Sequence, residues 1–148
     1  MPGGALHKQV TLITGAGRGI GRAIALRFAK EGARVVICAR TKREIQQVAK
    51  DIRAAGGPVM AQATDISKPE AVRRLLNAIT RRFGRVDILI NNAGTLGPRI
   101  PLADYSTREW TRVIAVNLTG TFLVAHAALA LMIPERAGCI LSISSSVG

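Results

Sequence analysis

The feature that most constrains the fold is a regular alternation of short apolar runs with helical segments. Four runs rich in β-branched residues are typical of strands buried on both faces: Gln9–Thr14, Ala33–Cys38, Arg85–Ile90 and Gly138–Ile143. A weaker run covers Pro58–Thr64. Helical periodicity fills the intervals, over Gly19–Glu31, Lys42–Ala55, Pro69–Arg82 and Thr107–Ile133. This β-α alternation predicts an α/β fold with a doubly wound parallel sheet of five strands.

The length of the chain limits it to one domain. A chain of 148 residues is large enough for a single hydrophobic core, and its 48% hydrophobic and 20% charged residues are typical of a globular protein. Aromatic residues make up only 3%, so the core is expected to be aliphatic. We expect one domain over residues 1–148, incomplete at its C-terminus for reasons given below.

A glycine-rich turn follows the first expected strand. The stretch "TGAGRGIG", Thr14 to Gly21, leads directly into the first expected helix. Glycines at such a turn let backbone N–H groups approach a pyrophosphate, whose charge favours the positive end of the helix dipole. Gly15, Gly19 and Gly21 fit the spacing G-x-x-x-G-x-G rather than G-x-G-x-x-G. Together with the strand before it and the helix after it, the turn therefore predicts a phosphate cradle.

Four motifs follow one another along the chain. They are the Thr14–Gly21 turn with Gly15, Gly19, Ile20 and Gly21, an acid at Asp65, "NNAG" at Asn91–Gly94, and Asn117 within "VNLTGTF". In this order they resemble the classical short-chain dehydrogenase/reductase family. The resemblance implies a Rossmann-like, NAD(P)-binding domain. It also implies that Asp65 contacts adenine, that Asn117 is catalytic, and that further cofactor contacts come from Ile66, Asn91, Ala93 and Gly94. Taken singly, Asp65 is better explained as a helix N-cap before Pro69 and Asn117 as a polar residue on a helix face, but the four motifs in series favour the family.

The end of the second expected strand indicates which nicotinamide cofactor is bound. An acid about twenty residues after the glycine turn binds the ribose 2′-hydroxyl of NAD, whereas arginine accommodates the 2′-phosphate of NADP. Ala39 and Arg40 stand at this place, and Arg18 lies within the glycine turn. The pattern predicts NADP(H) as cofactor, with NAD(H) as the less favoured alternative.

The chain ends in "SISSSVG", where the resemblance implies the catalytic serine. Alignment on Ile143 and Gly148 places it at Ser145, and a one-residue slip would give Ser144 or Ser146. The implied role is a hydrogen bond to the carbonyl oxygen of the substrate during hydride transfer between a secondary alcohol and a carbonyl compound. The family's Tyr-x-x-x-Lys pair is missing, since Tyr105 is followed four places on by Glu109.

These observations leave three hypotheses for function. The favoured one is the N-terminal part of an NADP(H)-dependent oxidoreductase, inactive as this chain and homo-oligomeric as a full-length protein, acting on a small carbonyl or alcohol substrate. On this view the apolar long helix and the outer edge of the fifth strand would be left uncovered. The second is a non-catalytic NADP-binding or dimerising short protein. The third, a nucleic-acid binder, is suggested only by the net charge of +12.

Composition argues against other classes. Basic residues are spread through the amphipathic segments with acids between them, and no aromatic residues are interleaved to stack bases, so nucleic acid is not the expected partner. The longest apolar run near the end, Ala127–Ile133, is too short to span a bilayer, and no secretory signal precedes the first strand. A cytoplasmic location is expected. Cys38 and Cys139 both lie in strand-like runs and are expected to be buried, and no metal site is expected.

Overall fold

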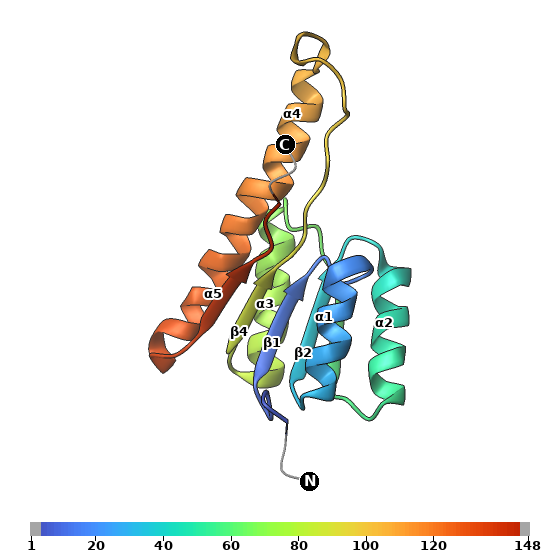
Figure 1. The fold of residues 1–148 in the computed structure, drawn as a ribbon. Helices are drawn as coiled ribbons and strands as arrows, with labels where there is room; N and C mark the ends of the chain where they lie inside the picture. Colours follow the sequence, from blue (N-terminus) through green and yellow to red (C-terminus); the bar gives the residue numbers. More distant parts are fainter. Residues whose placement is uncertain (1–3, 146–148) are drawn as a thin grey trace.

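A computed structural model describes residues 4–145 of the chain (Figure 1). Within these residues one sheet holds five parallel strands in the order β3-β2-β1-β4-β5. The strands are β1 (Val10–Thr14), β2 (Arg34–Ala39), β3 (Val59–Ala63), β4 (Ile88–Asn91) and β5 (Cys139–Ser142). The chain moves outward from β1 to β3, then returns to pair β4 with the other side of β1. This reversal makes the sheet doubly wound and confirms the predicted fold class.

The helices begin and end close to the predicted positions. They are α1 (Gly19–Lys30), α2 (Lys42–Ala54), α3 (Pro69–Phe83), α4 (Thr107–Ile114) and α5 (Thr121–Glu135), and a short 3-10 turn covers Leu102–Asp104. α3 ends at Gly84, whose φ of 72° lets its N–H bond the Thr80 carbonyl, so glycine terminates the helix as the sequence predicts.

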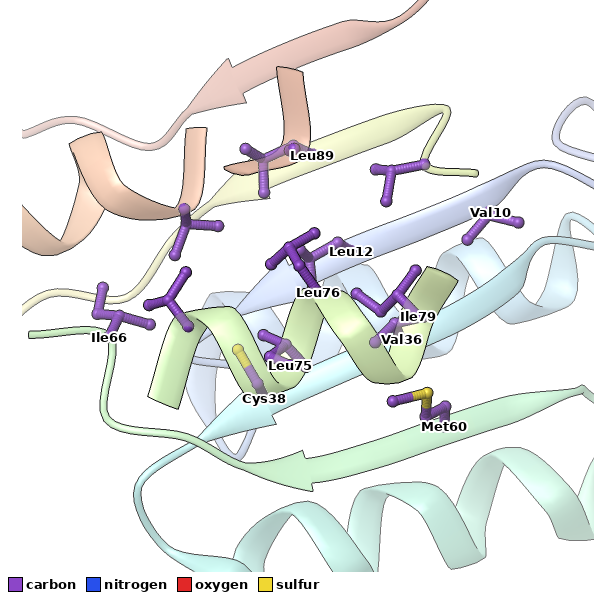
Figure 2. Close-up of a cluster of buried hydrophobic side chains, with 14 of the residues drawn as sticks. Val10, Leu12, Val36, Cys38, Met60, Ile66, Leu75, Leu76, Ile79 and Leu89 are labelled. Atoms are coloured by element: carbon purple, nitrogen blue, oxygen red, sulfur yellow. The ribbon is translucent and has the colours of Figure 1, made fainter. Parts of the chain in front are cut away.

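The core lies on both faces of the sheet and is aliphatic. Successive residues of β1 point to opposite faces, so Leu12 packs in the layer of α3 and α5 while Ile13 packs in the layer of α1 and α2. Figure 2 shows the first layer, where Leu75 of α3 lies over the sheet beside Cys38. Burial raises the pKa of the Cys38 thiol to about 12, so this cysteine is an inert apolar residue at neutral pH.

The predicted helix over Thr107–Ile133 is continuous but not uniform. Its middle, Ala115–Gly120, is a π-helical turn between α4 and α5. Here the Thr121 hydroxyl donates to the Asn117 carbonyl at 2.9 Å, and a Cβ at Gly120 would come within 2.8 Å of Ile66. Glycine therefore allows the helix to approach the segment after β3, and π turns are frequent at functional sites.

The prediction that the fifth strand is buried was wrong. All four residues of β5 are exposed, and Cys139 is exposed with them. β5 lies at the edge of the sheet and, within residues 4–145, has a partner strand on only one side. Its neighbour α5 also presents apolar side chains to solvent. The exposed apolar residues of this region are Leu118, Phe122, Leu129, Ile133, Ile140, Leu141 and Ile143.

The length and apolar composition of the long helix are relevant to the expectation that no segment spans a membrane. Among the described residues, Thr107–Glu135 taken as one helix is long and apolar enough to cross a bilayer, and 22% of its most apolar 18-residue window is buried. One such helix is weak support for a membrane span, because core helices of soluble proteins meet the same criteria. The helix also packs against α3 and β4. The absence of a membrane span stays a prediction.

Candidate cofactor site

The turn after β1 forms a shallow cradle at the carboxyl edge of the sheet. Gly15 has a φ of +63°, and a Cβ there would lie 2.8 Å from the Ala93 Cα, so only glycine fits. Gly19 also has a positive φ, of +55°, and begins α1. Arg18, the N-cap residue, makes no side-chain cap, which leaves the first amides of α1 available to an anion.

Asn92 joins the glycine turn to the segment after β4. Its Nδ2 donates to the carbonyl oxygens of Thr14 at 3.0 Å and Gly15 at 3.2 Å. In return, the Thr14 hydroxyl accepts from the Asn92 and Ala93 amides, both at 3.0 Å, and donates to the Ile90 carbonyl at 3.4 Å. The hydroxyl's donor and both its lone pairs are thus used. The two turns form one bonded unit at the point where strand order reverses.

Above this unit lies a pocket of about 300 Å³. Seven of the residues predicted for cofactor binding line it: Gly15, Arg18, Arg40, Asp65, Ile66, Ala93 and Gly94. Five others do not: Thr14, Gly19, Ile20, Gly21 and Asn91. Thr14 and Gly21 are buried beneath the turn and shape it, whereas Ile20 points to solvent with 60% of its surface exposed. Asn91 is buried, and its carbonyl accepts from the Ile143 amide at 2.9 Å.

Further lining residues were not predicted from the sequence. They are Gly17, Cys38, Ala39, Thr41, Glu44, Thr64, Asn92 and Val116. Asn92 belongs to the "NNAG" motif and adjoins the predicted residues Asn91 and Ala93, so the motif could have identified it as a site residue. Glu44 comes from α2, and a Cβ at Gly17 would lie 2.7 Å from its Oε2, so its carboxylate rests against the glycine turn.

The pocket is lined by carboxylates that form no ion pair among the described residues, whereas most carboxylates of this chain do form one. Six of the nine carboxylates form ion pairs: those of Glu31, Asp51, Glu70, Asp87, Glu109 and Glu135. Within residues 4–145 the three without one are Glu44, Asp65 and Asp104, and the first two line the pocket beside Arg18 and Arg40. Asp65 accepts from the Ser67 amide at 3.0 Å and the Ser67 hydroxyl at 2.7 Å, which fixes its carboxylate in a local turn.

Asn117 and Ser145 lie outside the pocket lining. The Asn117 amide is bonded to Thr95, with Oδ1 accepting from the Thr95 amide at 2.8 Å and Nδ2 donating to its carbonyl at 2.9 Å. Its Oδ1 also lies 3.6 Å from the Cβ position of Gly94, so Asn117 adjoins the pocket wall. Ser145 is exposed beyond the carboxyl end of β5. The alternative Ser146 lies outside the described residues.

Comparison with known proteins identifies the family of this chain. The sequence profile of the short chain dehydrogenase family matches residues 9–148. The chain belongs to this family. Among curated relatives, it is 39% identical to a short chain dehydrogenase/reductase of Macrophomina phaseolina over 143 residues, which cover 95% of the chain and 82% of the relative. The fold, the glycine turn and the comparisons therefore agree on membership of this family.

Two solved structures show the same architecture as this chain. A metagenomic short-chain oxidoreductase in complex with NADP matches it with a TM-score of 0.91 at 40% identity, covering 95% of the chain and 63% of that structure. A 3-ketoacyl-ACP reductase of Sinorhizobium meliloti matches with a TM-score of 0.90 at 41% identity, covering 92% and 53%. The chain thus spans between about half and two thirds of these solved structures.

Proposed function

We propose that this chain binds NADP(H) as part of an oxidoreductase that interconverts a secondary alcohol and a carbonyl compound by hydride transfer. The observation that carries the proposal is the pair Arg18 and Arg40, which both line the pocket at the carboxyl edge of the sheet. Arg40 directly follows β2, where an acid would favour NAD. Within residues 4–145 neither arginine has an ion-pair partner, so both remain available to a 2′-phosphate.

The residues present fit a dinucleotide. Gly15 and Gly17 line the pocket next to the start of α1, where Arg18 makes no side-chain cap and the first amides of the helix are available to an anion. Asp65 and Ile66 would hold the adenine, Arg18 and Arg40 the 2′-phosphate, and the glycine turn the pyrophosphate. When bound, NADPH supplies the hydride. Glu44 adds a negative charge near the glycine turn, which favours a restrained rather than an extreme preference for NADP.

Two side chains are proposed to act on the substrate. Ser145 would donate a hydrogen bond to the carbonyl oxygen of the substrate, and Asn117 would complete the hydrogen-bonded surroundings of the reacting group. The general acid of the family, a tyrosine with a lysine four places on, has no counterpart in this sequence, because Tyr105 is followed at that spacing by Glu109. We therefore propose that these 148 residues bind the cofactor and contribute part of a catalytic site.

The cofactor preference can be tested with two single substitutions, each of which removes one positive charge at one end of β2. Arg40→Gln should weaken NADPH binding about 10-fold or more, because a hydrogen bond to a charged group contributes about 1.5–3 kcal/mol. Arg34→Gln is the matched control, since Arg34 begins the strand that Arg40 follows and lies at the opposite edge of the sheet. The measurement is calorimetric titration with NADPH and NADH.

The two control results separate local recognition from long-range charge. NADH binding should change less than about twofold in either variant, and NADPH binding should be almost unchanged in Arg34→Gln. Equal losses in both variants would assign the effect to net charge, and NADH binding as tight as NADPH binding in the wild-type chain would overturn the NADP assignment.

An assay of NADPH oxidation tests whether the 148-residue chain catalyses hydride transfer or only binds the cofactor. The 148-residue chain should bind NADPH yet give no oxidation above the uncatalysed rate with carbonyl substrates, because a general acid contributes about 10²- to 10⁴-fold in rate. The assay follows NADPH absorbance with a panel of small ketones. A reductase rate from this chain would show that another group delivers the proton, and would remove the need for the Tyr-x-x-x-Lys pair.

The remaining proposals concern partners and location. The substrate is proposed to be a small carbonyl compound or alcohol, and the whole protein is proposed to be a homo-oligomer. The exposed apolar surface of α5 and β5 supports the second proposal, because a large uncovered apolar face favours association. A cytoplasmic location also stays a proposal.

A further inference from the structure

Arg112 of α4 connects its helix to the segment that follows the pocket wall. Its Nη1 donates to the Thr95 hydroxyl at 2.7 Å and its Nη2 to the Leu96 carbonyl at 2.9 Å. Nη2 also donates to Glu109 Oε2 at 2.8 Å, and Nε to the same oxygen at 3.0 Å. Four of the five guanidinium N–H donors are thus used. We call this group, formed by Arg112, Glu109, Thr95 and Leu96, the Arg112 clamp.

The clamp is more than a pairing of charges along a helix. α3 carries an ion pair of the same spacing, in which Arg73 donates from Nε and Nη2 to Glu70. Arg73 is 65% exposed and bonds nothing beyond its own helix among the hydrogen bonds of the described residues, whereas Arg112 is 38% exposed and reaches a segment 16 and 17 residues away. The additional bonds of Arg112 therefore join two parts of the chain.

The held segment also orients Asn117. Both backbone groups of Thr95 bond the Asn117 amide, and its hydroxyl bonds Arg112, so Thr95 is fixed at three points. Because the oxygen and the nitrogen of the Asn117 amide each have a partner on Thr95, only one orientation of the amide satisfies both bonds. The preceding residue, Gly94, lines the cofactor pocket. The clamp is one residue away from the pocket wall.

The guanidinium itself is held in place from its own helix. Ser106 caps α4 by accepting from the Glu109 amide at 3.2 Å, which fixes the first turn from which the Glu109 carboxylate reaches Arg112. Figure 1 shows the segment between β4 and α4 running along this helix, and a Cβ at Gly97 would overlap the Tyr105 hydroxyl. The segment is therefore packed closely where it leaves the clamp.

We propose that Arg112 is a positioning residue, which fixes the Thr95–Leu96 segment and thereby the orientation of the Asn117 amide beside the cofactor pocket. Its functional meaning rests on the proposed function, because Asn117 matters only if the pocket serves an oxidoreductase. Arg112 itself lies outside the lining of that pocket. Its loss should thus disturb Thr95 and Asn117 without removing a cofactor contact.

Hydrogen exchange of the Thr95 amide in the 148-residue chain, followed by NMR, tests the proposal. Arg112→Ala should speed exchange of this amide by about tenfold or more, while the amide of buried Leu12 changes no more than it does in Arg73→Ala. Arg73→Ala is the matched control, since it removes the same kind of helix ion pair without a clamp. A merely structural loss would speed both amides in parallel.

A second variant keeps the test decisive if Arg112→Ala fails to fold. Thr95→Val removes the hydroxyl acceptor and keeps the shape, and it should speed exchange at its own position by about threefold or more. Unchanged exchange at residue 95 in either variant, or a rise only in step with Leu12, would overturn the proposal.

Titration with NADPH distinguishes failure of the clamp from failure of the proposed function. Arg112→Ala should keep its NADPH affinity within about threefold of wild type, because no direct contact is removed. If the wild-type chain itself did not bind NADPH, the proposed function would fail, while the exchange of Thr95 would still decide whether Arg112 holds the segment.

Discussion

Replacing Gly15 by alanine is expected to weaken NADPH binding strongly and to destabilise the fold. Gly15 has a φ of +63°, which costs a residue with a Cβ about 1–2 kcal/mol. The new Cβ would also meet the Ala93 Cα at 2.8 Å and the Ala93 amide nitrogen at 3.0 Å, and such overpacking costs about 1–3 kcal/mol. The free energy of unfolding should fall by about 2–5 kcal/mol, as measured by urea denaturation.

The effect on binding follows from the same contact. Displacement of Ala93 moves a residue of the pocket wall, so NADPH affinity should fall about 100-fold or more, which corresponds to about 2.8 kcal/mol. Gly19→Ala is the control, because Gly19 has a similar φ of +55° but no atom within 4 Å of its Cβ position. It should lose only about 1–2 kcal/mol of stability. Equal losses in the two variants would show that backbone conformation, not the contact with Ala93, is decisive.

Replacing Thr14 by valine is the second large expected effect. The substitution keeps the shape of the side chain but removes the oxygen that accepts from the Asn92 and Ala93 amides. Thr14 is 1% exposed, so solvent reaches the site poorly, and each unpaired buried group costs about 1–3 kcal/mol. Unfolding should therefore be easier by about 2–5 kcal/mol, which thermal and urea denaturation both measure.

Thr14→Ser separates the hydroxyl from the methyl group. Serine retains the acceptor and the donor, so this variant should lose about 1 kcal/mol, the value of a small buried group, and keep its affinity for NADPH. If serine and valine were equally harmful, packing of the methyl group would be the dominant contribution, and the hydrogen bonds between the two turns would be of little consequence.

The sequence predicted those parts of the protein whose signal is local. Strands and helices were found within a few residues of their bounds because apolar periodicity and terminal glycines such as Gly84 act over one or two turns. The glycine turn was found for the same reason, since a positive φ at Gly15 needs that residue type. Arg40 was found because it directly follows a strand.

Features that depend on contacts between distant parts of the chain could not be predicted from local sequence patterns. Cys38 and Thr64 line one pocket only because β2 pairs with β3 in a particular register, and no spacing in the sequence encodes that register. Cys139 was expected to be buried because an apolar run looks the same at the edge of a sheet as at its centre. The contact of Arg112 in α4 with Thr95 joins two residues 17 positions apart, and no periodic signal in the sequence marks it.

The hydrogen bonds between Asn92 and the glycine turn also reduce the conformational entropy that the pocket floor loses when a ligand binds. Thr14, Gly15 and Asn92 are already joined before any ligand arrives, so the floor of the pocket is preorganised. Ordering a loop on binding opposes association, and a floor that needs no ordering avoids that loss of conformational freedom. The side chains of Arg18 and Arg40 are exposed and must still be immobilised. The entropic resistance to binding is therefore concentrated in two flexible side chains rather than in the backbone of the turn.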